Sequence, residues 1–161
     1  MLRKTLVFIF IIFLFSACEK VETYSDIPEI KLKKFEAKIE ETALDPTLFG
    51  KLTFSFVDGD GDIGFTENSD TIDDNNIVDV IIKEYNPEGE LITDTVGPFY
   101  LPYFKESSYK KSLKGDILIN MPRSDKSIDT AYYEFYIIDR ESHQSNIVTT
   151  PVYIYSELLQ Q

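Results

Sequence analysis

The fold is decided by the stretch Leu52-Thr53-Phe54-Ser55-Phe56-Val57, which is followed directly by Asp58-Gly59-Asp60-Gly61-Asp62-Ile63-Gly64. In the first part, a large apolar residue occupies every second position. Alternate side chains of a β-strand point to the same face. The stretch therefore predicts a strand with one buried face, and this strand runs into an acidic, glycine-rich segment.

The same period of two recurs along the chain. Ile30 and Leu32 are out of step with Phe35, Ala37 and Ile39, which predicts a β-bulge between the two groups. Turn signals separate further expected strands at 77–85, 91–96, 99–104, 117–121, 132–138 and 147–155, and no amphipathic helix is expected. These segments, about seven strands, predict an all-β fold: an antiparallel sandwich of the immunoglobulin or fibronectin type III kind. A closed barrel is the alternative.

The acidic segment has the composition of a calcium site. If its backbone is extended, Asp58, Asp60 and Asp62 lie on one face and repel one another unless a cation or water screens them. Calcium takes about six to eight oxygen ligands, which closely spaced aspartates supply. An EF-hand is not expected, because Ile63 and Ser69 stand where its glycine and glutamate belong. The site must then be completed by distant residues, and a solvated Asp-Gly turn is the alternative.

The expected topology supplies those distant ligands. In a sandwich, the loop after the second strand and the loop before the last strand lie at the same end. The later loop contains Asp139 and Glu141, which are predicted ligands together with the three aspartates, and Asn146 is a further candidate. Transition metals are not expected, because the chain has a single histidine and a single cysteine. Residues 66–76 have the composition of a hydrated acidic loop, with a second ion as the alternative.

The N-terminus has the composition of a lipoprotein signal. Arg3 and Lys4 precede an apolar run, Leu6 to Phe15, of about half the length that a membrane-spanning helix needs. The following Phe15-Ser16-Ala17-Cys18 resembles a bacterial lipobox, with phenylalanine where leucine is usual. We expect a signal peptide at 1–17, lipid on Cys18, a tether at 18–29 and the sandwich at 30–157. An ordinary secretory signal is the alternative.

The net charge of the chain limits the classes of partner that it can bind. The net charge of the 161 residues is −12, and loss of Arg3 and Lys4 with the signal makes it −14 for the remaining 144. So acidic a chain repels phosphate backbones and anionic headgroups, which argues against nucleic acid and against a basic membrane-binding patch. Membrane attachment is therefore expected through the acyl chains on Cys18.

One aromatic and basic segment, 99–109, stands apart from this acidic background. Aromatic faces beside lysines can stack on sugar rings, so carbohydrate binding is the alternative function. Its candidate residues are Tyr100, Tyr103, Phe104 and Tyr109. The competing interpretation is structural: Phe99, Leu101 and Tyr103 face the core, and the lysines protect a sheet edge.

Catalytic motifs are not apparent. The sequence contains no Gly-x-Ser-x-Gly motif whose serine His143 could activate, and no feature identifies a carboxylate pair as catalytic. We expect a protein that is not an enzyme, and a hydrolase that uses envelope carboxylates is a third hypothesis.

Three motifs together resemble a known group of proteins. These are the lipobox, Phe-x-Asp-Gly-Asp-Gly-Asp-Ile-Gly at 56–64 and Asp-Arg-x-x-x-x-Ser-Asn at 139–146. They are similar to small uncharacterised Bacteroidetes-type lipoproteins with an immunoglobulin-like domain. Asp139-Arg140-Glu141 also resembles the Asp-Arg-Glu element of cadherin calcium sites. The resemblance implies an outer membrane lipoprotein of a Gram-negative cell, periplasmic or surface-exposed. From the residues themselves, we expect its domain to be stabilised by calcium and to bind an envelope protein or glycan, or to play a structural part.

Overall fold

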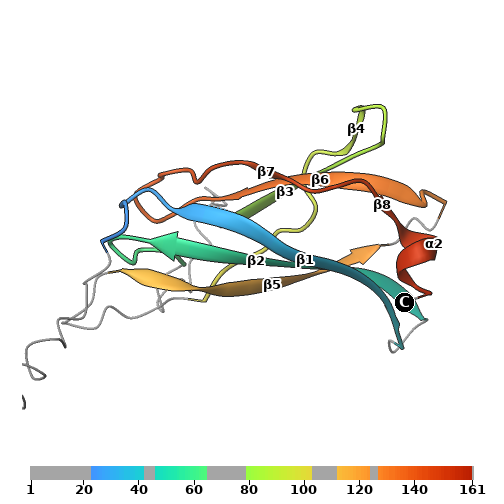
Figure 1. Cartoon of the computed structure of the whole chain (residues 1–161), viewed down its shortest axis with the longest axis horizontal. Coiled ribbons are helices and arrows are strands. Elements are labelled where there is room, and N and C mark those ends of the chain that lie inside the picture. The colour runs from blue at the N-terminus through green and yellow to red at the C-terminus, as the bar shows by residue number, and fades with distance from the viewer. Residues whose placement is uncertain (1–22, 42–45, 65–78, 103–111, 124–126, 161) are drawn as a thin grey trace, which may run out of the picture.

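The computed structural model describes residues 23–41, 46–64, 79–102, 112–123 and 127–160. Residues 1–17 and Cys18, for which a signal peptide and a lipid site are predicted, lie outside these ranges. The described residues form strands and one short helix (Figure 1). The elements are β1 (Glu29–Glu40), β2 (Thr47–Asp58), β3 (Val80–Tyr85), β4 (Leu91–Thr93), β5 (Leu113–Arg123), β6 (Thr130–Ile137), β7 (Val148–Thr149), β8 (Tyr153–Ile154) and α2 (Tyr155–Leu158).

The strands form two antiparallel sheets, which lie as two layers in Figure 1. One sheet has the order β1-β2-β5, and the other has the order β4-β3-β6-β7. Strand β8 also pairs with β6, beyond β7 along the same edge. The predicted all-β class is thus confirmed. Among the described residues, no helix is long and apolar enough to cross a membrane.

Strand β1 contains the predicted bulge. Its pairing with β2 shifts register between Leu32 and Lys34. Ile30 before the shift and Phe35 after it are both buried. The extra residue restores the inward direction of the apolar side chains, because a slip of one position would otherwise turn them to the solvent.

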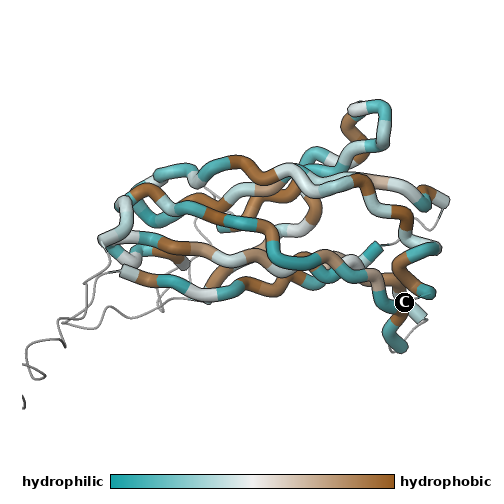
Figure 2. Tube along the Cα trace, viewed as in Figure 1, coloured by the Kyte–Doolittle hydropathy of each residue, from teal (hydrophilic) through white to brown (hydrophobic). Residues whose placement is uncertain are grey.

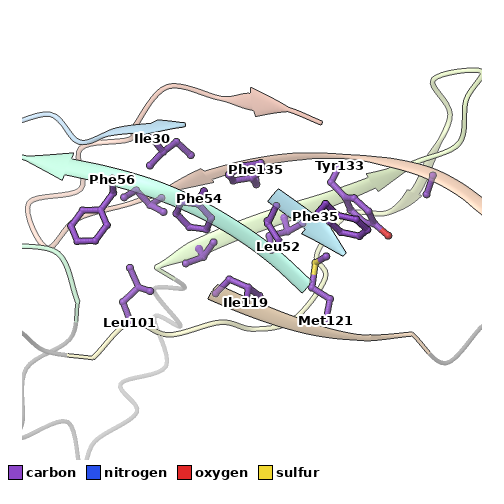
Figure 3. Packing of buried hydrophobic residues seen from close by; sticks show 14 of the residues in the cluster. Ile30, Phe35, Leu52, Phe54, Phe56, Leu101, Ile119, Met121, Tyr133 and Phe135 are labelled. Carbon is purple, nitrogen blue, oxygen red and sulfur yellow. The ribbon is translucent and has the colours of Figure 1, made fainter. Parts of the chain in front are cut away.

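Strand β2 is the centre of its sheet and alternates along its whole length. Every second residue from Leu48 is buried, and Leu52 and Phe54 are fully buried. In Figure 2, brown hydrophobic and teal hydrophilic residues alternate along the strands. Between the layers, the ring of Phe54 packs on that of Phe135 from β6, with centroids 5.1 Å apart (Figure 3). Burial of such rings supplies most of the stability of a domain without disulfides.

The strands predicted at 91–96, 99–104 and 147–155 are shorter than expected. The predicted strand at 147–155 is divided into β7 and β8 because Pro151 lacks the N–H that a sheet ladder needs. The chain then turns into α2 at Tyr155. The strand predicted at 91–96 ends at Thr93. Of the strand predicted at 99–104, Phe99 makes an isolated bridge to Val80, and residues 103 and 104 lie outside the described ranges.

Near α2, the two layers are joined by a buried ion pair. A guanidinium N–H of Arg123 donates to Glu84 at 2.5 Å and to the hydroxyl of Tyr133 at 2.8 Å. Its other terminal nitrogen donates to the carbonyl of Ile128 at 2.8 Å, and the group lies over the ring of Tyr155. The opposite end of the molecule, toward which the β2 arrow points in Figure 1, contains the acidic residues.

Candidate metal centre

The buried face of β2 ends in a carboxylate. Asp58 continues the alternation of Phe54 and Phe56, and its exposed fraction is 0%. The extended backbone ends here, so the predicted alternation does not carry on to Asp60 and Asp62. Instead, the chain curls back in what we call the acidic turn, residues 58–64, helped by the positive φ of Gly61.

The acidic turn is fixed at both of its sides. At its start, the N–H of Gly59 donates to the carbonyl of Ser25, ahead of β1. At its end, the guanidinium of Arg140 donates to the carbonyl oxygens of Ile63 at 3.4 Å and Gly64 at 3.0 Å. Ile63 is itself completely buried. The turn is therefore held as part of the fold, unlike a simple solvated hairpin tip.

The second acidic segment, the 139–146 loop, docks on this turn from the other sheet. The backbone N–H of Arg140 donates to the carbonyl of Asp62 at 3.3 Å. The N–H of Glu141 donates to Asp62 Oδ2 at 3.1 Å. The loop therefore reaches the turn through main-chain groups, and this contact brings the side chains of Asp139 and Glu141 toward it.

Asp139 is held in place by His143. The backbone N–H of His143 donates to Asp139 Oδ1 at 2.7 Å, and its ring Nδ1 lies 3.0 Å from Oδ2. This contact raises the pKa of His143 above its ordinary value, because the carboxylate favours the charged ring. Asp139 is buried, and the hydrogen bonds from His143 fix its orientation, as hydrogen bonds from neighbouring residues commonly do for carboxylates that bind metal ions.

The five predicted ligands are brought together, in two groups of three. Asp58, Asp62 and Asp139 have carboxylate oxygens that all lie within 4.8 Å of one another, and all three residues are buried. Asp60, Asp62 and Glu141 form the second group by the same measure. Asp62 belongs to both.

The remaining candidate, Asn146, has a different role. Its side-chain oxygen accepts from the N–H of Ile30 at 2.8 Å, and its Nδ2 donates to the carbonyl of Ile30 at 3.0 Å. The amide group therefore pairs with β1 as a neighbouring strand would. Asn146 ties the 139–146 loop to the first sheet and does not join the carboxylates.

Several carboxylate oxygens at this end have no hydrogen bond from the protein. They are both oxygens of Asp58 and one oxygen each of Asp60 and Asp62, and all four atoms are buried. A buried charged oxygen without a partner is costly, and native proteins rarely leave one in that state. Asp58 is the clearest case, since neither of its oxygens has a partner.

The electrostatics agree with the geometry. Burial, together with the charges of Asp60, Asp62 and Asp139, raises the pKa of Asp58 from 3.8 to about 7, although the backbone N–H of Asp62 opposes this rise. Burial, together with Asp139 and Asp60, raises the pKa of Asp62 to about 6, although the N–H of Glu141 opposes this. Protonation or a bound cation would relieve this repulsion.

The donor set favours a hard cation. All the converging atoms are carboxylate oxygens. The ring Nδ1 of His143 is already engaged by Asp139. Oxygen ligands suit calcium or magnesium, and the flexible geometry of calcium tolerates a mixed set of carboxylates better than the octahedron of magnesium does.

The described part of the aromatic segment serves the core. Leu101 is buried, and its N–H donates to Asp79 Oδ2 at 2.6 Å. Phe99 packs against the core, whereas Tyr100 is 53% exposed. The other candidates for sugar binding, Tyr103, Phe104 and Tyr109, lie outside the described residues.

Three residues of this region were not singled out as functional from the sequence. His143 orients Asp139, and the spacing of four residues between them is a signal that could have indicated the pair. Arg140 holds the end of the acidic turn. Asp79 is buried beside these elements, and burial raises its pKa to about 6. Nothing in the local sequence distinguishes Asp79 from a surface aspartate.

Comparison with family models, with curated protein sequences and with solved structures finds no match to this chain.

Proposed function

We propose that this chain is a lipid-anchored, non-catalytic protein of the cell envelope whose immunoglobulin-like domain is stabilised by calcium. The observation that carries the calcium proposal is the state of Asp58. Its carboxylate is completely buried, neither oxygen accepts a hydrogen bond of normal geometry, and carboxylate oxygens of Asp62 and Asp139 lie within 4.8 Å of one of its own. The backbone N–H of Asp62 is close enough to lower the pKa of Asp58, but burial and the neighbouring charges outweigh it. A divalent cation would supply the partner that Asp58 and Oδ1 of Asp62 lack, with Asp139 as a third ligand.

The partition of the strands supports an immunoglobulin-like sandwich. The first, second and fifth strands share one sheet, and the third, sixth and seventh share the other. Immunoglobulin domains divide strands A, B and E from C, F and G in the same way. The short β4 beside β3 then corresponds to the additional C′ strand of variable-type domains.

The position of the site supports a stabilising role for the ion. Asp58 ends β2 in one sheet, whereas Asp139 follows β6 in the other. An ion held by both residues joins the two layers at an end where the apolar core stops. Such an ion would link the two sheets at this end, as the ion pair of Arg123 and Glu84 links them near α2.

Lipid attachment is proposed from the sequence. Phe15-Ser16-Ala17-Cys18 resembles a lipobox, and no second cysteine is present to pair with Cys18. Labelling cells with a palmitate analogue tests this proposal. We expect label on the wild-type protein and none on Cys18→Ala, and label retained by that variant would exclude Cys18 as the lipid site.

Thermal unfolding tests the calcium proposal. Extracellular calcium modules have dissociation constants of about 0.1–1 mM, so about 10 mM calcium should stabilise the folded state by about 1–3 kcal/mol. The midpoint temperature of the purified lipoprotein in detergent should then rise by several degrees over the value in chelator. Asp58→Asn should abolish this rise, whereas Asp94→Asn, at an exposed pair with Lys83, should keep it. An identical midpoint in calcium and in chelator would exclude the proposal.

A further inference from the structure

We infer that the acidic end holds two divalent cations side by side, with Asp62 shared between them. The inner cation is held by Asp58, Asp62 and Asp139, and the outer one by Asp60, Asp62 and Glu141. This inference rests on the proposed calcium binding. It concerns how many ions are bound and how their affinities differ.

The grouping of the oxygens is the first argument. The five carboxylates do not form one set: they fall into two sets of three that have Asp62 in common. Asp58 and Asp139 belong only to the fully buried set, and Asp60 and Glu141 belong only to the other. A carboxylate has two oxygens, and one side chain can therefore serve two neighbouring ions.

The state of Asp62 is an independent argument. Its exposed fraction is 7%, and one of its oxygens, Oδ1, is buried without a hydrogen bond. The N–H of Glu141 holds the other oxygen, Oδ2. This hydrogen bond fixes the carboxylate that the two sets share. The same bond makes the position of Glu141 depend on Asp62.

Charge balance also favours two ions over one. When ionised, the five carboxylates carry five negative charges, Arg140, bound to the end of the acidic turn, contributes one positive charge, and His143 contributes a second when its ring is protonated. One divalent cation would then leave one or two negative charges in excess, and a second divalent cation would remove this excess. Carboxylates with uncompensated charge in a partly buried site repel one another.

The two positions differ in exposure. All three residues of the inner set are buried, whereas in the outer set Asp60 is half-buried and Glu141 is exposed. Buried and rigid ligands bind more tightly than exposed ones, and water completes the coordination of an ion at the surface. The inner ion is therefore bound more tightly, and the outer ion exchanges more readily with the solvent.

Calorimetric titration of the calcium-free lipoprotein with calcium tests the inference. We expect two binding events per chain. Glu141→Gln should weaken the second event by about 10-fold or more and change the first by less than about 3-fold. Asp60→Asn should have the same effect, while Glu88→Gln, an exposed glutamate in the turn before β4, should change neither event.

The outcomes separate this inference from the proposed function. A single event in the wild type that is unaffected by Glu141→Gln and lost in Asp58→Asn would overturn the second ion and leave calcium binding intact. Two events that both survive Glu141→Gln would also overturn the outer position. No binding at all would remove the proposed calcium function itself. Circular dichroism shows whether each variant is folded, and Glu141 is exposed, so its substitution leaves the core unchanged.

Discussion

The N–H of Gly59 donates a 2.8 Å hydrogen bond to the carbonyl oxygen of Ser25, so the segment that leads into β1 lies directly on the acidic turn. No side chain fits between them. A Cβ added to Gly59 would lie 2.5 Å from the carbonyl oxygen of Tyr24 and 2.6 Å from that of Ser25. Both obstacles are backbone atoms, which cannot move aside as a flexible side chain can.

Gly59→Ala is therefore expected to reduce the free energy of unfolding by about 1–3 kcal/mol, the usual cost of overpacking. Denaturant titration in saturating calcium measures the loss. Gly115→Ala is the matched control, because the Cβ added there would meet only the ring of Phe56, at 3.3 Å. Equal stability of the two variants would show that the contact of Gly59 is not restrictive.

Asp79→Asn is expected to change how stability depends on pH. Burial raises the pKa of Asp79 from 3.8 to about 6, and the N–H of Leu101 and the charge of Arg140 oppose this rise. The folded state thus binds the proton more tightly than the unfolded chain, so stability is lost as the pH rises from about 4 through 6.

The asparagine cannot ionise and escapes this loss. Relative to the wild type, Asp79→Asn should gain on the order of 1–3 kcal/mol between pH 4 and pH 7. Denaturant titrations across this range measure the difference. Asp116→Asn, at an exposed pair with Lys33, should change by less than about 1 kcal/mol. A difference between Asp79→Asn and the wild type that does not vary with pH would refute the assignment.

Arg123→Met is expected to cost about 3–5 kcal/mol of stability, because it leaves the carboxylate of Glu84 buried without a counter-charge. The double variant Glu84→Gln with Arg123→Met should lose less than the sum of the two single variants. A double-mutant cycle by denaturant titration measures this coupling. Strict additivity would mean that the two groups do not interact in the folded state.

Asn146→Ala is expected to cost about 1–3 kcal/mol, because it removes the partners of both backbone groups of Ile30. Calcium affinity should stay within about 3-fold of the wild type, since Asn146 contacts β1 and not the carboxylates. Gln144→Ala, on the exposed side of the same loop, should change neither quantity. A large loss of calcium affinity in Asn146→Ala would instead indicate that Asn146 is a calcium ligand.

Much of the fold could be predicted because its signals are local. The alternation around Phe54 indicates a half-buried strand, and the change of step between Leu32 and Phe35 indicates the bulge that the pairing shows. The lengths of the last strands could not be predicted in the same way. They depend on where Pro151 interrupts the ladder and on where Tyr155 finds its partners in the core.

The predicted ligands could be proposed because sandwich topology places two loops at the same end. Their division into an inner and an outer set could not be proposed, since it depends on how the acidic turn curls after Asp58. The contact between Gly59 and Ser25 is also invisible in the sequence. The sequence does not distinguish a glycine that is required by a close approach of the backbone from one that is required by a positive φ.

The two ends of the molecule solve the burial of a carboxylate in different ways. Glu84 is paired with Arg123 of the same chain, whereas no described residue gives Asp58 a counter-charge, so Asp58 takes either a proton or a cation from the medium. If calcium is that counter-ion, the chain is least stable where calcium is scarce and reaches full stability only where calcium is plentiful. If the chain is also exported, as proposed, it would be easier to unfold before secretion than after it, and binding of the ion would complete its folding outside the cytoplasm.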